Sequence, residues 1–254
     1  MGAGHAHPLY LHEHSRLHGL APEAKLVAAF GLVVCIAITP REAVWAFVAY
    51  AVSIALLAAL SRVPPGFLAL RLAAVAPFVV FALFIPFIGS GDRIDVWGLS
   101  LSVDGLWGMW NILAKATLGA SVSIVLTATT EIPDIIRGMG KLRVPALFVS
   151  IAMFMVRYLE LIAEELRRTR IAMTSRGYDP RWLWQARPIA SSAGAMFVRS
   201  YERGERVHAA MLSRGFSGTM PGLGHRRATT EEWWRVALVV GLFAAIAAAS
   251  LVLT

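Results

Sequence analysis

Apolar runs separated by short polar breaks make up most of the chain. A helix needs about 20 mostly apolar residues to cross the hydrocarbon core of a bilayer, and five runs come near that length. The first run is short, and the lysine that begins it can extend it by reaching to the membrane surface. We therefore predict an all-α integral membrane protein with about five spans, at Lys25–Thr39, Val44–Leu60, Leu68–Ile88, Ile112–Thr130 and Val236–Leu253.

The breaks between these runs indicate how the spans connect. Pro40–Glu42 forms a tight turn, which pairs the first two spans as a hairpin. Pro77 and Pro86 lie inside the third run, where neighbouring helices can satisfy the backbone groups that a kink leaves unbonded. Residues 96–103 alternate weakly between apolar and polar, which is typical of a short hairpin at the membrane surface.

A polar, basic segment, residues 131–235, separates the fourth and fifth spans. Its only strongly apolar stretch is Pro145–Val156, about 12 residues or roughly 18 Å of helix, which is too short for an ordinary span. We expect this stretch to form a helix at the membrane surface or against the bundle.

Composition agrees with a membrane protein and gives one orientation. Apolar residues make up 57% of the 254 residues and charged residues only 16%, whereas soluble domains carry about 25% charged residues. The net charge of +8 reflects basic loops of the kind that stay in the cytoplasm, so we expect no nucleic-acid partner. Acidic residues 89–104 then lie outside. The predicted regions are a cytoplasmic His-rich segment (1–23), four spans (24–130), a cytoplasmic coupling region (131–235) and a last span whose C-terminus is outside (236–254).

One short phrase occurs twice in the basic segment. Met173–Tyr178 reads Met-Thr-Ser-Arg-Gly-Tyr, and Met211–Phe216 reads Met-Leu-Ser-Arg-Gly-Phe. Each phrase closes a predicted helix with a one-sided apolar stripe, Val156–Arg176 and Ala195–Arg214. Glycine suits the left-handed position that ends a helix, and the exposed carbonyls of the last turn favour an arginine.

Helix capping alone explains a single Arg-Gly pair, but two matching copies on one side of a membrane indicate docking to two similar partner surfaces. Arginine offers a planar, permanently charged fork for carboxylates and carbonyls, and a neighbouring aromatic ring adds buried area. The candidate docking residues are Ser175, Arg176, Gly177, Tyr178, Ser213, Arg214, Gly215 and Phe216.

Both helices also carry features that indicate packing. Glu164 and Arg168, like Glu202 and Arg206, stand four residues apart with the acid first, which is the favourable order. Gly204 lies in the middle of the second helix, where glycine costs about 1 kcal/mol relative to alanine. We predict that Gly204 lets the two long helices cross closely.

With these motifs the chain resembles the transmembrane T component of energy-coupling factor transporters, the EcfT/CbiQ family. Ser175–Gly177 and Ser213–Gly215 match the two Ala-Arg-Gly motifs of that family, with serine in place of alanine. His18–Leu26 is similar to the residues that begin its first helix, although Ala-Pro stands where Asp-Pro is usual. Thr129–Asp134 and Lys141–Pro145 resemble the stretch that precedes its coupling helices.

The resemblance implies a function and a set of partners in the inner membrane of a prokaryotic cell. Two ABC-type ATPase subunits, which hold ATP and Mg, would dock on the two Arg-Gly ends. A separate CbiM-like membrane subunit would capture the substrate. This chain would pass motion between them and bind no cofactor itself. It contains no Gly-x-x-x-x-Gly-Lys-Ser/Thr loop, so we expect it not to be an enzyme.

A histidine-rich N-terminus bears on the substrate. Such a tail either binds Ni²⁺ or Co²⁺ or is simply solvated. It favours cobalt or nickel uptake over the vitamin uptake that is the alternative within the family. The histidines are weak metal-ligand candidates: His5, His7, His12, His14 and His18.

Two residues within the spans have both a functional and a structural explanation. Lys115 interrupts the fourth span, and such a charge is either functional or reaches to the membrane surface. Cys35 lies in the first span and most simply contributes packing. The rival functions are a membrane scaffold that holds a soluble partner without transport and a membrane enzyme that acts on lipid or peptide.

The predicted sidedness can be tested by cysteine labelling. In a chain that carries Cys35→Ala, a cysteine at Asp179 should react with a membrane-impermeant maleimide only when the reagent reaches the cytoplasmic side. Labelling of this cysteine from outside intact cells would overturn the orientation.

Overall fold

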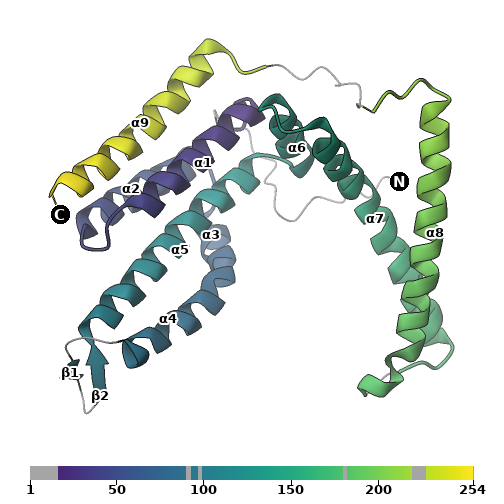
Figure 1. Ribbon diagram of the computed structural model, residues 1–254, viewed down its shortest axis with the longest axis horizontal. Coiled ribbons are helices and arrows are strands. Elements are labelled where there is room, and N and C mark those ends of the chain that lie inside the picture. The colour runs from purple at the N-terminus through teal and green to yellow at the C-terminus, as the bar shows by residue number, and fades with distance from the viewer. Residues whose placement is uncertain (1–16, 90–92, 97–98, 180–181, 219–226, 254) are drawn as a thin grey trace. The chain divides into compact units, whose positions relative to one another are not determined.

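The computed structural model describes residues 17–89, 93–96, 99–179, 182–218 and 227–253. The chain divides into two compact units (Figure 1). Unit 1 comprises residues 1–142 and 226–254, and unit 2 comprises residues 143–225. The doubled phrase therefore lies wholly in unit 2.

Unit 1 is a bundle of helices with one small hairpin. Helix α1 lies between α9 and α5, and α4 packs along α5 (Figure 1). Its helices are α1 (Pro22–Ile38), α2 (Val44–Leu60), α3 (Pro65–Leu72), the 3₁₀ helix η1 (Ala73–Val75), α4 (Ala76–Ile88), α5 (Val103–Thr129), α6 (Ile132–Lys141) and α9 (Thr230–Leu253).

The breaks in unit 1 follow the turn chemistry of the sequence. η1 interrupts the third span just before Pro77, and Pro77 occupies the first turn of α4, where a missing N–H does no harm. The predicted break at Pro77 is therefore confirmed, whereas Pro86 lies inside the continuous helix α4. Strands β1 (Arg93–Val96) and β2 (Leu99–Ser102) pair antiparallel, so the predicted hairpin is present and begins three residues earlier than expected. The Ser102 hydroxyl then accepts the Gly105 N–H at 3.2 Å and caps α5.

Four helical segments in the described part of the chain are long and apolar enough to cross a membrane: Pro65–Ile88, Val103–Thr129, Ala146–Ser175 and Thr230–Leu253. Three of these confirm predicted spans. The 17-residue helices α1 and α2 each reach about 25 Å, slightly less than the roughly 30 Å hydrocarbon core. The protein is thus a multi-pass, all-α membrane protein.

The remaining segment, α7 (Ala146–Ser175), corrects the analysis of the sequence. A short apolar helix and a separate amphipathic one were expected, but the structure has one continuous helix of 30 residues. No glycine or proline interrupts the sequence between its ends, so nothing ends a helix at Val156. The whole helix is therefore long and apolar enough to cross a membrane, and the cytoplasmic position of α7 stays a prediction.

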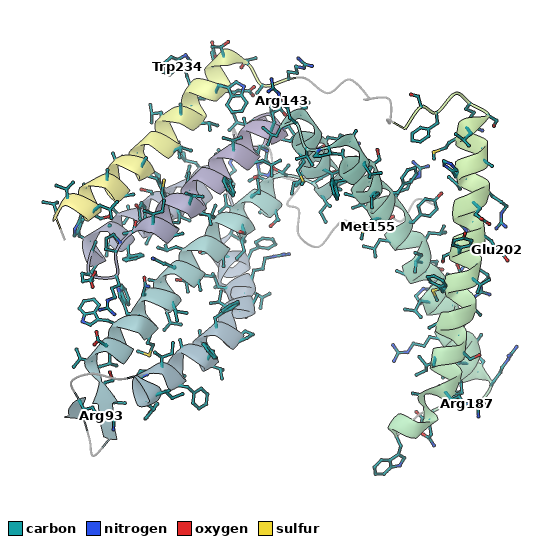
Figure 2. All side chains as sticks on the ribbon, in the orientation of Figure 1. Arg93, Arg143, Met155, Arg187, Glu202 and Trp234 are labelled. Atoms are coloured by element: carbon teal, nitrogen blue, oxygen red, sulfur yellow. The ribbon has the colours of Figure 1, made fainter. Side chains whose placement is uncertain are left out.

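Unit 2 contains α7, the 3₁₀ helix η2 (Leu183–Ala186) and α8 (Arg187–Leu212). Helix α8 is longer than the predicted Ala195–Arg214 at its beginning, where Pro188 occupies the first turn and is tolerated there. Both long helices expose many apolar side chains, and Figure 2 shows Met155 projecting from α7.

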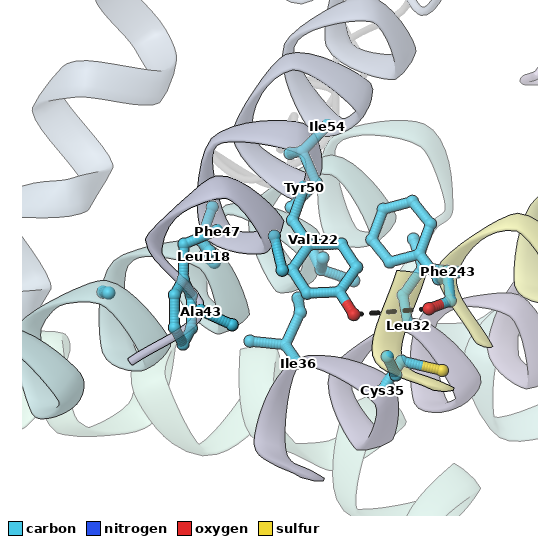
Figure 3. Packing of buried hydrophobic residues seen from close by; sticks show 13 residues of the cluster. Leu32, Cys35, Ile36, Ala43, Phe47, Tyr50, Ile54, Leu118, Val122 and Phe243 are labelled. Carbon is cyan, nitrogen blue, oxygen red and sulfur yellow. Dashed lines mark hydrogen bonds between the residues drawn. The ribbon is translucent and has the colours of Figure 1, made fainter. Parts of the chain in front are cut away.

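The core of unit 1 joins α1, α2, α5 and α9 around one tyrosine. Tyr50 is fully buried and stacks on Phe243, with ring centroids 4.8 Å apart. Its hydroxyl donates to the Phe243 carbonyl at 3.3 Å (Figure 3) and lies 3.1 Å from the hydroxyl of Thr39. Cys35 is buried in the same cluster, as predicted. The polar tip of this large apolar residue is thereby satisfied inside the bundle.

Two lysines join α1 and α5 at opposite ends of α1. Lys25 of α1 donates to the carbonyl of Thr129, the last residue of α5, at 2.8 Å, and to that of His18 at 3.1 Å. Lys115 of α5 donates to the carbonyl of Ala37, next to the end of α1, at 2.8 Å. Each ammonium thus sits at the negative end of the other helix.

These hydrogen bonds show that both lysines have a structural role. Lys25 has only 8% of its surface exposed, so the expectation that it reaches out to the membrane surface is wrong. The carbonyls at the end of α5 lie inside the bundle, and the ammonium satisfies one of them. Lys115 serves in the same way as a helix-end donor to α1.

Replacing Lys25 by methionine should lower the stability of unit 1. The change keeps most of the volume but leaves the Thr129 carbonyl buried without this donor, at a cost of about 1–3 kcal/mol. Thermal unfolding in detergent should show a midpoint lower by several degrees. Lys115→Met, at a less buried position, is the matched control and should shift the midpoint less. Equal midpoints for Lys25→Met and the wild type would contradict this assignment.

Candidate functional site

The two copies of the Met-x-Ser-Arg-Gly-aromatic phrase form the same helix end. After α7, the N–H of Tyr178 donates to the carbonyl of Met173 at 3.1 Å, and that of Gly177 donates to Thr174 at 2.9 Å. After α8, Phe216 donates to Met211 and Gly215 donates to Leu212, both at 3.0 Å. This pair of crossed hydrogen bonds is the Schellman motif.

The glycines make these ends possible. Gly177 and Gly215 both have φ of +80°, a left-handed conformation that costs other residues free energy. Each motif serine bonds back to its own helix, Ser175 to the Ile171 carbonyl and Ser213 to the Ala210 carbonyl, both at 3.0 Å. The two copies of the phrase therefore form the same backbone conformation at the ends of α7 and α8.

The arginine of each copy is presented to the surroundings. Arg176 and Arg214 are both exposed, whereas Tyr178 and Phe216 are half-buried. Within the described residues, neither guanidinium takes part in an ion pair. The Tyr178 hydroxyl additionally donates to the Gln185 carbonyl, which fixes the turn after α7. Each end thus offers a fork of N–H donors beside an aromatic ring.

Several other charged side chains of unit 2 form ion pairs within their own helix. Glu164 accepts from Arg167 and Arg168, all at 2.8 Å, and Arg206 lies 3.8 Å from Glu202. Both predicted i,i+4 pairs are therefore present. Hydrogen bonds from Arg167 and Arg168 therefore occupy both oxygens of the Glu164 carboxylate.

One carboxylate joins the two long helices, and sequence analysis missed it. Glu165 of α7 lies 3.0 Å from Arg199 and 3.5 Å from Arg203, both on α8. The partners are more than 30 residues apart, so no local spacing reveals the link. Further along, the Ser192 hydroxyl approaches the sulfur of Met173 at 3.7 Å. Polar side chains thus connect α7 and α8.

An apolar groove of about 340 Å³ lies between the two helices. Phe154, Tyr158 and Ile162 of α7 line one side, and Gly204 and Met211 of α8 lie on the other. A Cβ added at Gly204 would meet no described atom within 4 Å. The predicted close helix crossing at Gly204 is therefore wrong. Gly204 instead lies at the edge of the groove.

The histidine candidates gain no support from the described residues. His5, His7, His12 and His14 lie outside them. His18 is half-buried, and its carbonyl accepts from Lys25. No group of three or more His, Cys, Asp or Glu side chains in the described part of the chain is arranged to hold a metal ion.

Comparison with known proteins adds a family. The model of the family described as "Cobalt transport protein", CbiQ, matches residues 13–225. An energy-coupling factor transporter transmembrane protein EcfT of Bacillus selenitireducens is 28% identical over 94% of this chain and 93% of its own length. The cobalt transport protein CbiQ of Rhodobacter capsulatus is 28% identical over 61% of each chain. A putative fused cobalt transport protein CbiMQ of Methanocorpusculum labreanum is 25% identical over 55% of this chain and 24% of its own.

Valine at Gly177 or Gly215 should unravel the corresponding helix end. The left-handed φ is strained for a β-branched residue by about 1–3 kcal/mol. Hydrogen exchange at the amides of Tyr178 and Phe216 should accelerate in the matching variant. Gly204→Ala is the matched control: its position is helical and open, so it should stabilise α8 by about 1 kcal/mol. Unchanged exchange in both valine variants would contradict the role of the glycines.

Proposed function

The chain belongs to the CbiQ family of cobalt transport proteins, and from this we propose that it is the coupling subunit of an energy-coupling factor importer. It carries motion from two ABC-type ATPase subunits, which bind ATP and Mg, to a separate substrate-capture subunit in the membrane. The chain itself is a non-catalytic transmembrane component. The observation that carries the proposal is the pair of identical Arg-Gly helix ends in unit 2.

Two equal sites on one chain fit two copies of one partner. The same hydrogen bonds form both ends, and each presents an exposed arginine beside an aromatic ring. Arg176 and Arg214 donate to carboxylates or carbonyls in a groove of each ATPase, and Tyr178 and Phe216 add apolar area. A scaffold for one soluble protein needs only one such end, which favours the transporter over that alternative.

The exposed apolar surface of unit 2 fits a membrane partner. Five apolar side chains at helical spacing are exposed along one side of α7: Phe148, Ile151, Met155, Leu159 and Leu166. Exposed apolar patches of this extent mark interaction surfaces. We propose that α7 lies at the cytoplasmic surface of the membrane, and we assign this stripe to the capture subunit and to the lipid there. The relative named as a fused cobalt transport protein CbiMQ supports a CbiM-like partner, since its name indicates a CbiM part and a CbiQ part in one protein.

Cobalt is the proposed substrate, with nickel and vitamins as alternatives. The family description and the name of the Rhodobacter capsulatus relative favour cobalt, whereas other relatives carry the general name EcfT. Because the capture subunit selects the substrate in this scheme, the residues of this chain do not decide it. The proposed orientation keeps residues 131–235 in the cytoplasm, where ATP is available, with the N-terminus inside and the C-terminus outside.

Reversing the charge of both motif arginines should separate the chain from its ATPases. We expect Arg176→Glu plus Arg214→Glu to lose co-purification of the ATPase subunits and cobalt uptake, because two favourable contacts become repulsive. Each single variant should retain one ATPase. Arg170→Glu, five residues before the end of α7 and also exposed, is the matched control and should bind normally. Full association and uptake in the double variant would refute the docking role.

A further inference from the structure

A buried carboxylate lies where the chain passes from unit 1 to unit 2 and back. Glu23, in the first turn of α1, has only 4% of its surface exposed. Its two oxygens each accept from the ammonium of Lys141 at 3.1 Å, and one of them also accepts the N–H of Ala228 at 2.8 Å. A buried carboxylate is costly unless it is paired, so losing either partner would leave a buried charge without compensation.

The two partners of Glu23 are the two places where the chain of unit 1 meets unit 2. Lys141 is the last residue of α6, and unit 2 begins two residues later at Arg143. Ala228 follows residue 226, at which the chain returns to unit 1, and precedes α9. One side chain of α1 therefore holds both the outgoing and the returning segment.

Neighbouring contacts make this junction stiff on the unit 1 side. A Cβ added at Gly138 of α6 would lie 3.1 Å from the backbone nitrogen of Glu23, so α6 packs directly on the beginning of α1. On the other segment, the carboxylate of Glu232 accepts the N–H of Thr229 at 2.8 Å and fixes the first turn of α9.

The backbone takes a left-handed conformation just beyond the junction. Arg143, the first residue of unit 2, has φ of +67°, a conformation that is uncommon for a residue with a side chain. Pro145 then begins α7 as its N-cap. Only Leu142 separates the Lys141 contact from this turn, so Glu23 holds the chain at the edge of unit 1.

We propose that Glu23 is a positioning residue that couples the movement of unit 2 to helices α1 and α9. Two attachment points on one carboxylate make a displacement of unit 2 pull on the bundle, whereas loose segments would let unit 2 swing without moving it. This proposal rests on the proposed function, because it concerns how ATP-driven movement reaches the spans.

Transport per ATP hydrolysed, measured on the assembled complex in proteoliposomes, tests the proposal. Glu23→Ala should keep the ATPases bound and hydrolysing ATP while cobalt transported per ATP falls about fivefold or more. Glu23→Gln retains an acceptor for the Ala228 N–H, so its cobalt transport per ATP should fall less. Lys141→Met should show a loss similar to that of Glu23→Gln. Glu42→Ala removes an exposed carboxylate that pairs only with Arg41 in the contacts described (2.8 Å) and should match the wild type.

The outcomes separate the two proposals. If the wild-type chain binds no ATPase, the proposed function fails. If it binds and transports, and Glu23→Ala transports as much per ATP as the wild type, only the role of Glu23 is overturned. If Glu23→Ala does not fold, the other two variants decide. Wild-type transport per ATP in both Glu23→Gln and Lys141→Met would also overturn the role of Glu23.

Discussion

The structure of unit 1 depends on two helices that each place an ammonium group on the carbonyl end of the other. Lys25 and Lys115 do this reciprocally for α5 and α1, so the two helices are fixed along their length. Between these polar ends the packing is apolar, with Tyr50 and Phe243 at its centre. A helix end within a membrane bundle has little water to satisfy it, so an internal donor sets the relative height of the helices.

The end marked by Lys25 also carries the connections to unit 2. Glu23, two residues earlier on α1, binds both connecting segments. A single turn of α1 thus holds the end of α5 through Lys25 and the two chain junctions through Glu23. Under the proposed function, movement of unit 2 would reach the bundle through these two contacts of Glu23.

Local chemistry was predictable from the sequence, and contacts between distant segments were not. The caps at Gly177 and Gly215 follow from residues within six positions, and so does the pairing of Glu164 with Arg168. The burial of Lys25 depends on Thr129, 104 residues away, and the link from Glu165 depends on α8. Gly204 misled the analysis because a glycine in a helix fits either close packing or an open groove, and only the neighbouring helix decides between them. The length of α7 is hard to predict because its apolar first part and its charged second part differ in composition, although no residue between them ends the helix.

The central claim is that the two matching Arg-Gly helix ends each bind one ATPase subunit. Photo-crosslinking from Tyr178 and from Phe216, each replaced in turn by a photoreactive phenylalanine, tests it most directly. The account predicts that both positions capture an ATPase subunit, at the same or the homologous surface peptide. Capture of unrelated proteins by the two positions, or of an ATPase by neither, would contradict it.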